Sequence, residues 1–404
     1  MSVTLEDIRQ AASVIAGHVV RTPAVTALRL AEATGAEQVV LKLENQQYTG
    51  SFKDRGAYNK LASLDGAAKA AGVIAMSAGN HAQGVAYHAQ RLGIPATIVM
   101  PKGTPFNKVE RTAGFGARVL LEGDSIDAAA VFARERAAAE GLTFVHPYDD
   151  PLIVAGQGTI GLELLADHPD LDTIVAPIGG GGILSGIAIA ATSLKPGIRM
   201  VGVEAALYPS MHHAIRNLAP ANGGQTLADG IAVKSPGKLT QAIIGRLVEE
   251  DAIERAVQML AEQQKVVAEG AGAAGLAAMI AHPARFAGRR VGIVICGGNI
   301  DSRMLATVLM RGMVRDGRMV TLRIQISDTP GVLGRLAKLV GDSGGNIIEI
   351  HHQRMFNDLP PKRADIDAVI ETRNPEHYRE IVGALEADGF PTRLLSNLSR
   401  GTDH

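Results

Sequence analysis

Short aliphatic runs alternate with alanine-rich stretches along most of the chain, from Thr4 to about Phe286. The aliphatic runs lack the polar alternation of half-exposed strands, so we expect an α/β fold with buried, mostly parallel strands and helices between them. Ser125 or Asp124 is a suitable N-cap for one of these helices. The expected strands are 39–43, 72–76, 96–100, 117–121, 173–177, 200–204 and 292–296, and the clearest helices are 125–141 and 182–194.

A different pattern follows a polar, glycine-containing stretch at 311–319. We expect a domain boundary there, with a first domain of two α/β subdomains over 1–315 and a second domain over 319–404. The order of elements expected in the second domain is β-α-β-β-α-β, a ferredoxin-like plait. These elements are a strand with Val320, Leu322, Ile324 and Ile326 inward, a helix from 329–331 with Val332, Leu333, Leu336, Leu339 and Val340 inward, a strand at 346–352, a loop with Pro360 and Pro361, a strand at 365–372, a helix from Pro375 and a strand at 392–395.

Composition and charge narrow the class of protein. The 404 residues include 40 Lys and Arg against 41 Asp and Glu, with no basic block, so we expect neither nucleic acid nor an anionic membrane as a partner. No apolar run approaches the roughly 20 residues of a membrane-spanning helix. The acidic N-terminus is unlike a secretory signal, and the single cysteine, Cys296, cannot form an internal disulfide. We therefore expect a cytoplasmic protein.

The first candidate chemical group is Lys53 in the segment SFKDRGA, residues 51–57. Taken alone, a lysine among small and polar residues is most simply a solvated surface side chain. The alternative is an amine that condenses with pyridoxal phosphate, which requires a pKa lowered by a partly desolvated, electropositive site. Arg55 is a candidate source of part of that positive charge.

A second segment, SAGNHAQG at residues 77–84, stands at the end of a buried strand, where open α/β sheets bind ligands. It opens a helix whose free N–H groups suit an amino acid carboxylate, and the Asn80 amide suits a cofactor's phenolic oxygen. Alternatively, Asn80 and Ser77 only cap the helix. The candidate carboxylate-binding residues are Ser77, Ala78, Gly79, Asn80 and His81.

A third segment contains four glycines, 179–182, between a strand and a helix, which is typical of a phosphate-binding loop. The same glycines, with Gly186 and with Glu204 at the end of the next strand, also fit a dinucleotide-binding fold. An NAD-dependent oxidoreductase is therefore a rival hypothesis.

The fourth segment places Cys296 directly after the last buried strand. A thiol there suits a nucleophile, a metal ligand or a packed apolar group, but no base or companion cysteine stands near it in the sequence. A neutral partner for the pyridine nitrogen of pyridoxal phosphate fits better, because a neutral group favours prompt loss of a β-leaving group over a long-lived carbanion.

Together and in this order, SFKDRGA, SAGNHAQG, GGGGILSG and CGGNID resemble the motifs of threonine dehydratases (threonine ammonia-lyases), a branch of the fold type II, tryptophan-synthase-β-like pyridoxal-phosphate enzymes. The resemblance covers nearly the whole first domain. It implies that Lys53 holds pyridoxal 5'-phosphate as a Schiff base and removes the α-proton of the substrate. It also implies cofactor contacts from Phe52 to the ring, from Asn80 to the phenolic oxygen, from Gly179, Gly180, Gly181, Gly182 and Ile183 to the phosphate, and from Cys296, where the family often has serine, to the ring nitrogen.

The activity implied by this resemblance is conversion of L-threonine to 2-oxobutyrate and ammonia, with L-serine as a second substrate. A 3-hydroxyaspartate or serine ammonia-lyase of the same fold is the alternative, and the NAD-dependent oxidoreductase explains only one of the four segments. Ala78 stands where the similar serine racemases have a second base, so racemisation is expected to be poor. His81 stands where cysteine synthases have threonine. No metal is expected, because residues 208–210 lack the aspartate of the racemase cation site.

The second domain resembles an ACT domain, the amino-acid-sensing module of metabolic enzymes, in DTPGVL at 328–333 and GNI at 345–347. The resemblance implies feedback by a branched-chain amino acid, isoleucine or valine, in a homo-oligomer (dimer or tetramer) whose paired plaits hold the effector. A plait that only joins subunits and a non-catalytic sensor are the alternatives, and isoleucine biosynthesis and threonine breakdown both stay open as roles. The effector candidates are Asp328, Gly331, Val332, Leu333, Asn346 and Ile347.

Overall fold

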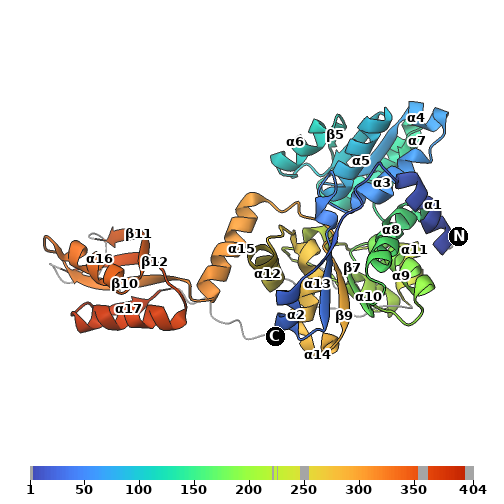
Figure 1. Cartoon of the computed structure of the whole chain (residues 1–404). Helices are drawn as coiled ribbons and strands as arrows, with labels where there is room; N and C mark the ends of the chain where they lie inside the picture. The colour runs from blue at the N-terminus through green and yellow to red at the C-terminus, as the bar shows by residue number, and fades with distance from the viewer. Residues whose placement is uncertain (1–2, 221–222, 225, 246–253, 354–362, 396–404) are drawn as a thin grey trace. The chain divides into compact units, whose positions relative to one another are not determined.

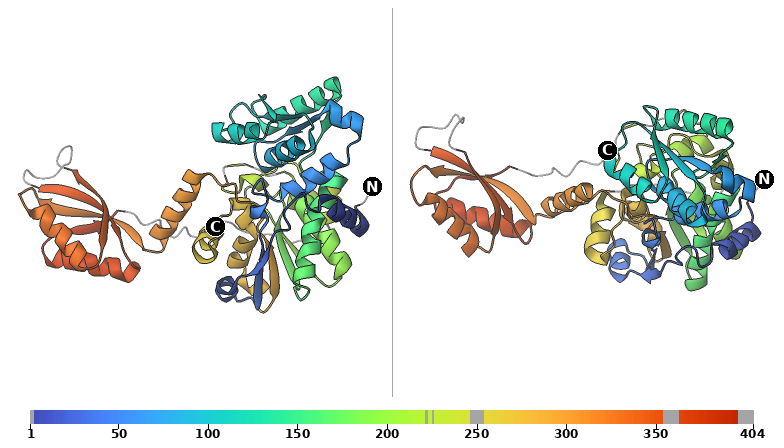
Figure 2. Two further views of the ribbon diagram at one scale, coloured as in Figure 1. Left: turned by 45° about the horizontal axis from the view of Figure 1, so that its top comes forward. Right: turned by 90° about the horizontal axis from the view of Figure 1, so that it is seen from above.

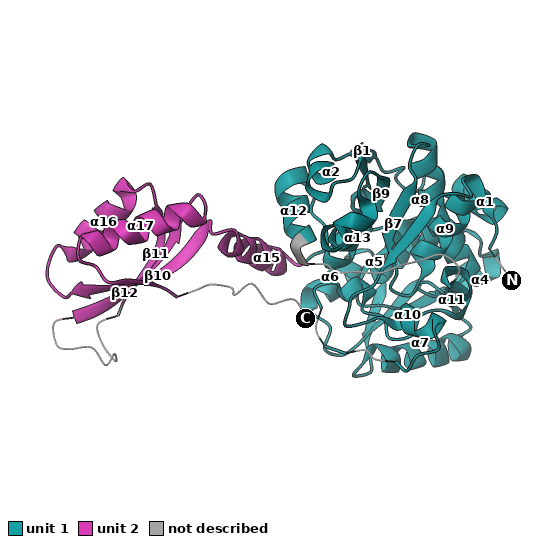
Figure 3. Cartoon of the chain, turned by 90° about the horizontal axis from the view of Figure 1, so that it is seen from below, with its two compact units in different colours: residues 1–300 teal, residues 301–404 magenta. Residues whose placement is uncertain are grey.

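The computed structural model of the chain describes residues 3–220, 223–224, 226–245, 254–353 and 363–395 (Figure 1). The expected loop with Pro360 and Pro361 lies outside these residues. The chain divides into two units, residues 1–300 and 301–404 (Figure 3). Within the described part, no helix is long and apolar enough to cross a membrane.

The first unit is built on two β-sheets. The five-stranded sheet has the order β1-β2-β9-β7-β8, in which every pairing except that of β1 with β2 is parallel. The four-stranded sheet has the order β5-β4-β3-β6 and is parallel throughout. The expected α/β class with mostly parallel sheets is thus confirmed. The strands are β1 Ala24–Thr26, β2 Gln38–Lys42, β3 Val73–Met76, β4 Ala96–Met100, β5 Arg118–Leu121, β6 Thr143–Phe144, β7 Thr173–Pro177, β8 Arg199–Val203 and β9 Arg290–Val294.

Each strand expected from an aliphatic run is present, with bounds that differ by two residues at most. The expectation that all of them are buried is wrong for β5. Its two end residues, Arg118 and Leu121, are exposed, Leu121 to 42%. The physical reason is that β5 is an edge strand, with only β4 as a neighbour.

Helices cover both sheets, and α3 lies between α5 and α8 (Figures 1 and 2). Glycines let these helices approach closely. A Cβ added to Gly156 of α8 would lie 2.7 Å from the Cα atom of Gly56 of α3, and one added to Gly186 of α9 would lie 2.3 Å from the Val154 carbonyl oxygen. The position of α3 is therefore fixed by backbone contact. The helices of this unit are α1 Leu5–Ile15, α2 Leu28–Thr34, α3 Lys53–Ala62, α4 Gly66–Ala71, α5 Asn80–Leu92, α6 Phe106–Gly114, α7 Ile126–Glu140, α8 Pro151–Asp167, α9 Gly182–Leu194, α10 Ser210–Ile215, α11 Lys238–Ile244, α12 Glu254–Gln264, α13 Gly270–Ala281 and α14 Pro283–Phe286, with 3-10 helices η1 Glu44–Gln46 and η2 Asp229–Ile231.

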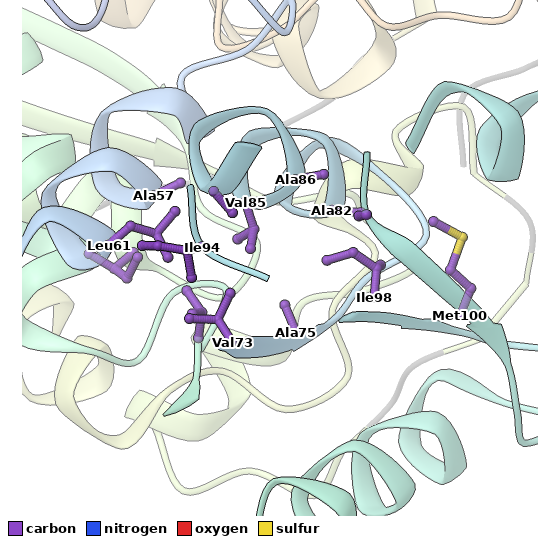
Figure 4. Packing of buried hydrophobic residues seen from close by; sticks show 14 residues of the cluster. Ala57, Leu61, Val73, Ala75, Ala82, Val85, Ala86, Ile94, Ile98 and Met100 are labelled. Carbon is purple, nitrogen blue, oxygen red and sulfur yellow. The ribbon is translucent and has the colours of Figure 1, made fainter. Parts of the chain in front are cut away.

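The core between α5 and the four-stranded sheet anchors the loop that joins β3 to α5. Ala82, Val85 and Ala86 on one face of α5 pack against Ala75 and Ile98 of the strands (Figure 4). All five side chains are almost completely buried. The loop that joins β3 to α5 is thus anchored at both of its ends. Helix α7 covers other residues of the same sheet, and Ser125 caps it by accepting from the Ala128 N–H, as expected.

The second unit has the expected β-α-β-β-α-β order after a leading helix, α15. Its sheet is antiparallel between neighbours, in the order β11-β12-β10-β13. Val320, Leu322, Ile324 and Ile326 of β10 are buried, as their alternation predicts. Leu333 is a correction, because it is 39% exposed instead of facing the core. The elements are α15 Ser302–Arg315, β10 Met319–Ser327, α16 Val332–Asp342, β11 Asn346–Gln353, β12 Arg363–Glu371, α17 Pro375–Ala387 and β13 Thr392–Leu394.

Candidate functional site

Lys53 is the first residue of α3, and its amine is held inside the first unit. Its Nζ donates to the Pro147 carbonyl oxygen at 2.6 Å and lies 4.9 Å from the centre of the Phe52 ring. Burial lowers the pKa of Lys53 to about 8, although Cys296 and Glu269 act in the opposite direction. An amine with this pKa is partly neutral near physiological pH, and the neutral amine is the form that condenses with an aldehyde. The interpretation of Lys53 as a solvated surface side chain is therefore wrong.

Arg55 does not supply the positive charge expected of it near Lys53. Its guanidinium is completely buried and donates to both carboxylate oxygens of Glu44, at 2.8 Å each, and to both of Glu163, at 2.7 and 2.9 Å. Lys42 donates to Glu163 as well, at 2.5 Å. Two cations and two carboxylates thus form a buried cluster that joins β2, η1, α3 and α8. Residues two positions apart in a helix differ by about 200° of rotation about its axis. Arg55 therefore lies on the opposite side of α3 from Lys53.

Asn80 begins α5, directly after the turn that follows β3. It does not cap the helix, because the N-cap is Gly79 and no side chain makes the capping bond. Instead its Nδ2 donates to Oε1 of Glu269 at 2.7 Å, and its Oδ1 accepts from Nδ2 of Asn299 at 2.8 Å. Ser77 also bonds only locally, through Oγ, which accepts from the Gly79 N–H at 3.1 Å. The first-turn N–H groups of α5 have no acceptors within the helix, so they suit a carboxylate.

His81, in the same turn, is a neutral group. Its Nε2–H donates to the Val145 carbonyl oxygen at 2.9 Å. Burial, aided by the charge of Lys53, lowers the pKa of His81 to about 3. His81 therefore holds the turn in place and carries no charge for a ligand at neutral pH.

Gly179, Gly180 and Gly181 lie between β7 and α9, and Gly182 is the first residue of α9. Gly179 and Gly181 have φ angles of +54° and +93°, and a Cβ on Gly181 would lie 2.6 Å from Cβ of Thr240. A Cβ on Gly180 would lie 2.2 Å from the ring of Tyr148. Larger residues would therefore be strained or collide at each of these positions. The loop leads into the positive end of α9, which begins at Gly182 and Ile183.

Cys296 is buried and follows β9, and its carbonyl oxygen accepts from the Phe52 N–H at 2.9 Å. Burial, together with the nearby Glu269 carboxylate, raises the pKa of the Cys296 thiol well above its usual value, against the opposing effect of Lys53. The thiol is therefore neutral and a poor nucleophile. Of the three ordinary roles for this cysteine, the structure favours a packed, neutral side chain next to Lys53.

Two residues that line the candidate site were missed from the sequence. Glu269, the N-cap residue of α13, has a carboxylate beside Asn80 and Cys296, but an acidic residue at the start of a helix is common and gave no signal. Tyr148 lies one residue after the Pro147 carbonyl that holds Lys53, and it packs on Gly180 and Gly182. The loop at 146–148 therefore joins Lys53 to the glycine loop.

Glu204, which favoured a dinucleotide-binding fold in the sequence, binds the backbone of a helix instead. Both carboxylate oxygens of Glu204 accept backbone N–H groups at the start of α10, from Met211 at 2.8 Å and from His212 at 3.0 Å. Glu204 is also almost completely buried, so its oxygens are not presented to a ribose. Among the described residues, no group of three or more His, Cys, Asp or Glu side chains is arranged to hold a metal ion.

The six effector candidates of the second unit fall into two groups. Asp328 to Leu333 follow the end of β10 and begin α16, whereas Asn346 and Ile347 begin β11. Asn346 and Met319, the first residue of β10, both pair with Glu371, so β11 begins level with the start of β10. The two groups therefore lie at opposite ends of the sheet within one chain, about 27 Å apart along eight residues of strand.

The site in the first unit fits pyridoxal phosphate. It contains an amine with a lowered pKa, an aromatic ring beside that amine, and a buried neutral thiol. The glycine loop leaves no room for a Cβ at Gly180 or Gly181 and ends at a helix N-terminus, which suits a phosphate. Ser51 lies two residues before Lys53, and Ser185 lies in the first turn of α9. Both hydroxyls are buried and make no hydrogen bond to a described residue.

Comparisons with known proteins agree with this geometry. The sequence profile described as pyridoxal-phosphate dependent enzyme matches residues 15–297. The chain is 44% identical over 401 residues to the L-threonine ammonia-lyase of Thermotoga maritima, covering 97% of this chain and 100% of that one. A maize serine racemase structure aligns at 32% identity with a TM-score of 0.71, over 78% of this chain and 98% of that one. The processed form of threonine deaminase isoform 2 from Solanum lycopersicum aligns at 32% identity with a TM-score of 0.70, over 76% and 86%.

Proposed function

The chain belongs to the pyridoxal-phosphate dependent enzymes and is a lyase, and from that premise we propose that it converts L-threonine to 2-oxobutyrate and ammonia. The observation that carries the proposal is the 44% identity to a threonine ammonia-lyase along 97% of the chain. This similarity includes the second unit, whereas the family profile matches only residues 15–297. The sequence similarity therefore extends along both units and is not confined to a fold that supports many activities.

Lys53 is the residue to which we assign both attachment of the cofactor and removal of the α-proton. Pyridoxal phosphate, when bound, supplies an electron sink for the negative charge that develops at the α-carbon of an amino acid. With a pKa of about 8, Nζ of Lys53 takes up and returns a proton close to neutral pH. The Pro147 carbonyl oxygen holds this nitrogen in place through one hydrogen bond.

The other residues bind and orient. The loop from Gly179 to Gly182 and the N-terminus of α9 hold the phosphate, and the Phe52 ring lies beside the amine. The first turn of α5, with Ser77, Gly79 and Asn80, receives the substrate carboxylate. Cys296 stays uncharged at the ring nitrogen, which favours loss of the β-hydroxyl over a long-lived carbanion.

Ala78 supports elimination over racemisation. Racemisation needs a second group that returns a proton to the opposite face of the α-carbon, and a methyl group cannot carry a proton. The likeness to a maize serine racemase concerns the fold, at 32% identity. We therefore expect D-serine to form from L-serine at well under about a hundredth of the elimination rate. D-serine formation at a rate comparable with pyruvate formation would contradict the role given to Ala78.

The test of the proposed substrate is a direct comparison of three amino acids. The purified chain, loaded with pyridoxal phosphate, is given L-threonine, L-serine or 3-hydroxyaspartate, and the 2-oxo acid and ammonia are measured. We expect the highest kcat/KM with L-threonine and a lower value with L-serine. A higher kcat/KM with 3-hydroxyaspartate would replace threonine by the alternative substrate and leave the lyase assignment intact.

For the second unit we propose a regulatory role, as an ACT domain that binds isoleucine or valine. Its plait topology supports the proposal, and so does the exposed Leu333 beside the start of α16. Because the two groups of candidate residues lie at opposite ends of one sheet, a site that uses both needs Asn346 from a second copy of the chain. We therefore expect inhibition by isoleucine or valine in a dimer or tetramer. Unchanged inhibition after Asp328→Ala or Asn346→Ala, or no response to either amino acid, would contradict this role.

A further inference from the structure

A chain of hydrogen bonds runs from the backbone of the first unit to the carboxylate that sequence reasoning missed. Nδ2 of Asn299 donates to the Thr49 carbonyl oxygen and to Oδ1 of Asn80, at 2.8 Å each. Nδ2 of Asn80 donates in turn to Oε1 of Glu269 at 2.7 Å. The residues come from separate elements: Asn299 follows β9, Asn80 begins α5 and Glu269 precedes α13.

This series of hydrogen bonds has a defined direction from donor to acceptor. A backbone carbonyl only accepts hydrogen bonds, so Thr49 requires the NH2 end of the Asn299 amide on its side. The same NH2 group points at Asn80, which must therefore present its oxygen. The NH2 end of Asn80 is then directed to Glu269, whose carboxylate accepts. The two ends of an amide are nearly equal in size, so this sequence of partners, and not shape, decides which end of Asn80 faces which way.

Glu269 is held in place by burial and by a backbone hydrogen bond. Its side chain is buried, and its N–H donates to the Gly297 carbonyl oxygen at 3.1 Å. A Cβ added to Gly297 would lie only 2.5 Å from Oε1 of Glu269, so glycine at this position leaves the space that the carboxylate occupies.

We propose that Glu269 and Asn299 are positioning residues for Asn80, which hold its amide so that one Nδ2–H bonds Glu269 and the other is presented to the phenolic oxygen of the cofactor ring. The inference rests on the proposed contact between Asn80 and the cofactor. It assigns to the Asn299 of the CGGNID motif, and to Glu269, a shared function that neither residue could perform alone.

The charges around Glu269 make this arrangement sensitive to pH. Burial and the charge of Asp229 raise the pKa of Glu269 to about 7, while the hydrogen bond from Asn80, the charge of Lys108 and the Asn299 N–H act in the opposite direction. Lys53 and Cys296 also lie within reach of this carboxylate. A protonated carboxyl is a weaker acceptor than a carboxylate, so the hold on Asn80 weakens as the pH falls through about 7.

Cofactor affinity of the full chain is the measurement that tests the proposal, because it does not depend on turnover. Pyridoxal phosphate is titrated into each variant from about pH 5.5 to 8.5, and the visible absorbance band is recorded. Glu269→Ala removes the acceptor, and we expect affinity at about pH 8 to fall roughly 10- to 100-fold, the effect of one hydrogen bond to a charged group. Glu269→Gln keeps an acceptor oxygen but cannot ionise, so its affinity should stay within about threefold of the wild type at low pH.

Asn299→Asp is the sharpest variant, because it keeps the shape of the side chain and turns a donor into an acceptor. It places an oxygen opposite both Thr49 and the Asn80 oxygen, so we expect a larger loss of affinity than in Asn299→Ala. The ratio of wild-type to Glu269→Gln affinity should rise as the pH increases through about 7. Asn299→Asp and Glu269→Gln leave the side-chain volume nearly unchanged, and far-ultraviolet circular dichroism checks that every variant folds.

Three results would overturn the inference: wild-type affinity in Glu269→Ala, Asn299→Asp no weaker than Asn299→Ala, or a pH-independent ratio between wild type and Glu269→Gln. Asn80→Ala separates this inference from the proposal beneath it. An Asn80→Ala variant with an unchanged band and affinity would show that Asn80 does not contact the cofactor. A changed Asn80→Ala with an unchanged Glu269→Ala would refute the positioning role alone.

Discussion

Replacing Arg55 with methionine should destabilise the first unit strongly and leave the pKa of Lys53 nearly unchanged. The guanidinium of Arg55 is fully buried and donates to all four carboxylate oxygens of Glu44 and Glu163. Methionine fills a similar volume but leaves the buried Glu44 and the mostly buried Glu163 with Lys42 as the remaining cation of the cluster. Removing one partner from a buried ion cluster costs about 3–5 kcal/mol of unfolding free energy.

This loss of unfolding free energy corresponds to a decrease in Tm. The first unit spans 300 residues, and unfolding entropy is about 2.1 cal/mol/K per residue, or roughly 0.6 kcal/mol/K for the unit. The expected decrease in Tm is therefore about 5–8 °C. It is best measured by circular dichroism on cofactor-free protein, because bound cofactor would add stability of its own.

Arg91→Met is the matched control for this experiment. Arg91 is exposed, and its guanidinium donates to the Tyr87 hydroxyl at 2.9 Å on the surface of α5. Its replacement should lower the Tm by about 1 °C or less. Equal melting of Arg55→Met and Arg91→Met would refute the structural role of Arg55. A rise of a full unit in the pKa of Lys53 in Arg55→Met would restore Arg55 as the source of positive charge near the amine.

Three further predictions concern the site itself. Gly181 has a φ of +93°, and a Cβ there would lie 2.6 Å from Thr240, so Gly181→Ala should bind pyridoxal phosphate at least about tenfold more weakly and lose about 1–3 kcal/mol of unfolding free energy. Gly35→Ala is the control for backbone strain alone, because Gly35 has a φ of +71° and a Cβ there would have no atom within 4 Å. Equal effects of the two substitutions would contradict the phosphate-loop role. The pKa of Lys53 is lowered to about 8, and only the neutral amine attacks the cofactor aldehyde. The rate of cofactor attachment, measured by stopped-flow absorbance, should therefore rise about tenfold per pH unit below about pH 8 and level off above it. A rate that does not change from about pH 6.5 to 9 would disagree with this role of the amine. Burial raises the pKa of Cys296, so its alkylation by iodoacetamide at about pH 8, followed by mass spectrometry, should be at least about 100-fold slower in native than in unfolded protein; similar rates would mean an accessible thiol.

Features of the fold that depend on local pattern could be predicted from the sequence. Strands β4 and β7 and helix α9 have the bounds expected from their aliphatic runs and glycine boundaries. Strand β5 shows the limit of this reasoning, because its aliphatic run resembles those of central strands but the strand lies at a sheet edge. A linear pattern records hydrophobicity and contains no information on which strand will have a neighbour on each side.

The site was predictable where chemistry is concentrated in one short segment. Asn80 and the glycine loop each follow the end of a strand, where ligands bind in parallel sheets, and Lys53 begins helix α3. Arg55 was misleading because proximity in sequence is not proximity across a helix: a shift of two residues turns the side chain to the opposite face. Glu269 was missed because its partner, Asn80, is 189 residues away in the sequence and the hydrogen bond between them exists only in the folded chain.

The most direct test of the central claim is the amount of 2-oxobutyrate and ammonia that the chain releases from L-threonine when Lys53 is present and when it is replaced by alanine. The wild-type chain with pyridoxal phosphate should release the two products in equal amounts. Lys53→Ala should lose the visible band of the attached cofactor and at least about a thousandfold in rate, because Lys53 is the residue to which we assign both cofactor attachment and removal of the α-proton. Failure of the wild type to consume L-threonine, or sustained elimination by Lys53→Ala, would contradict the account.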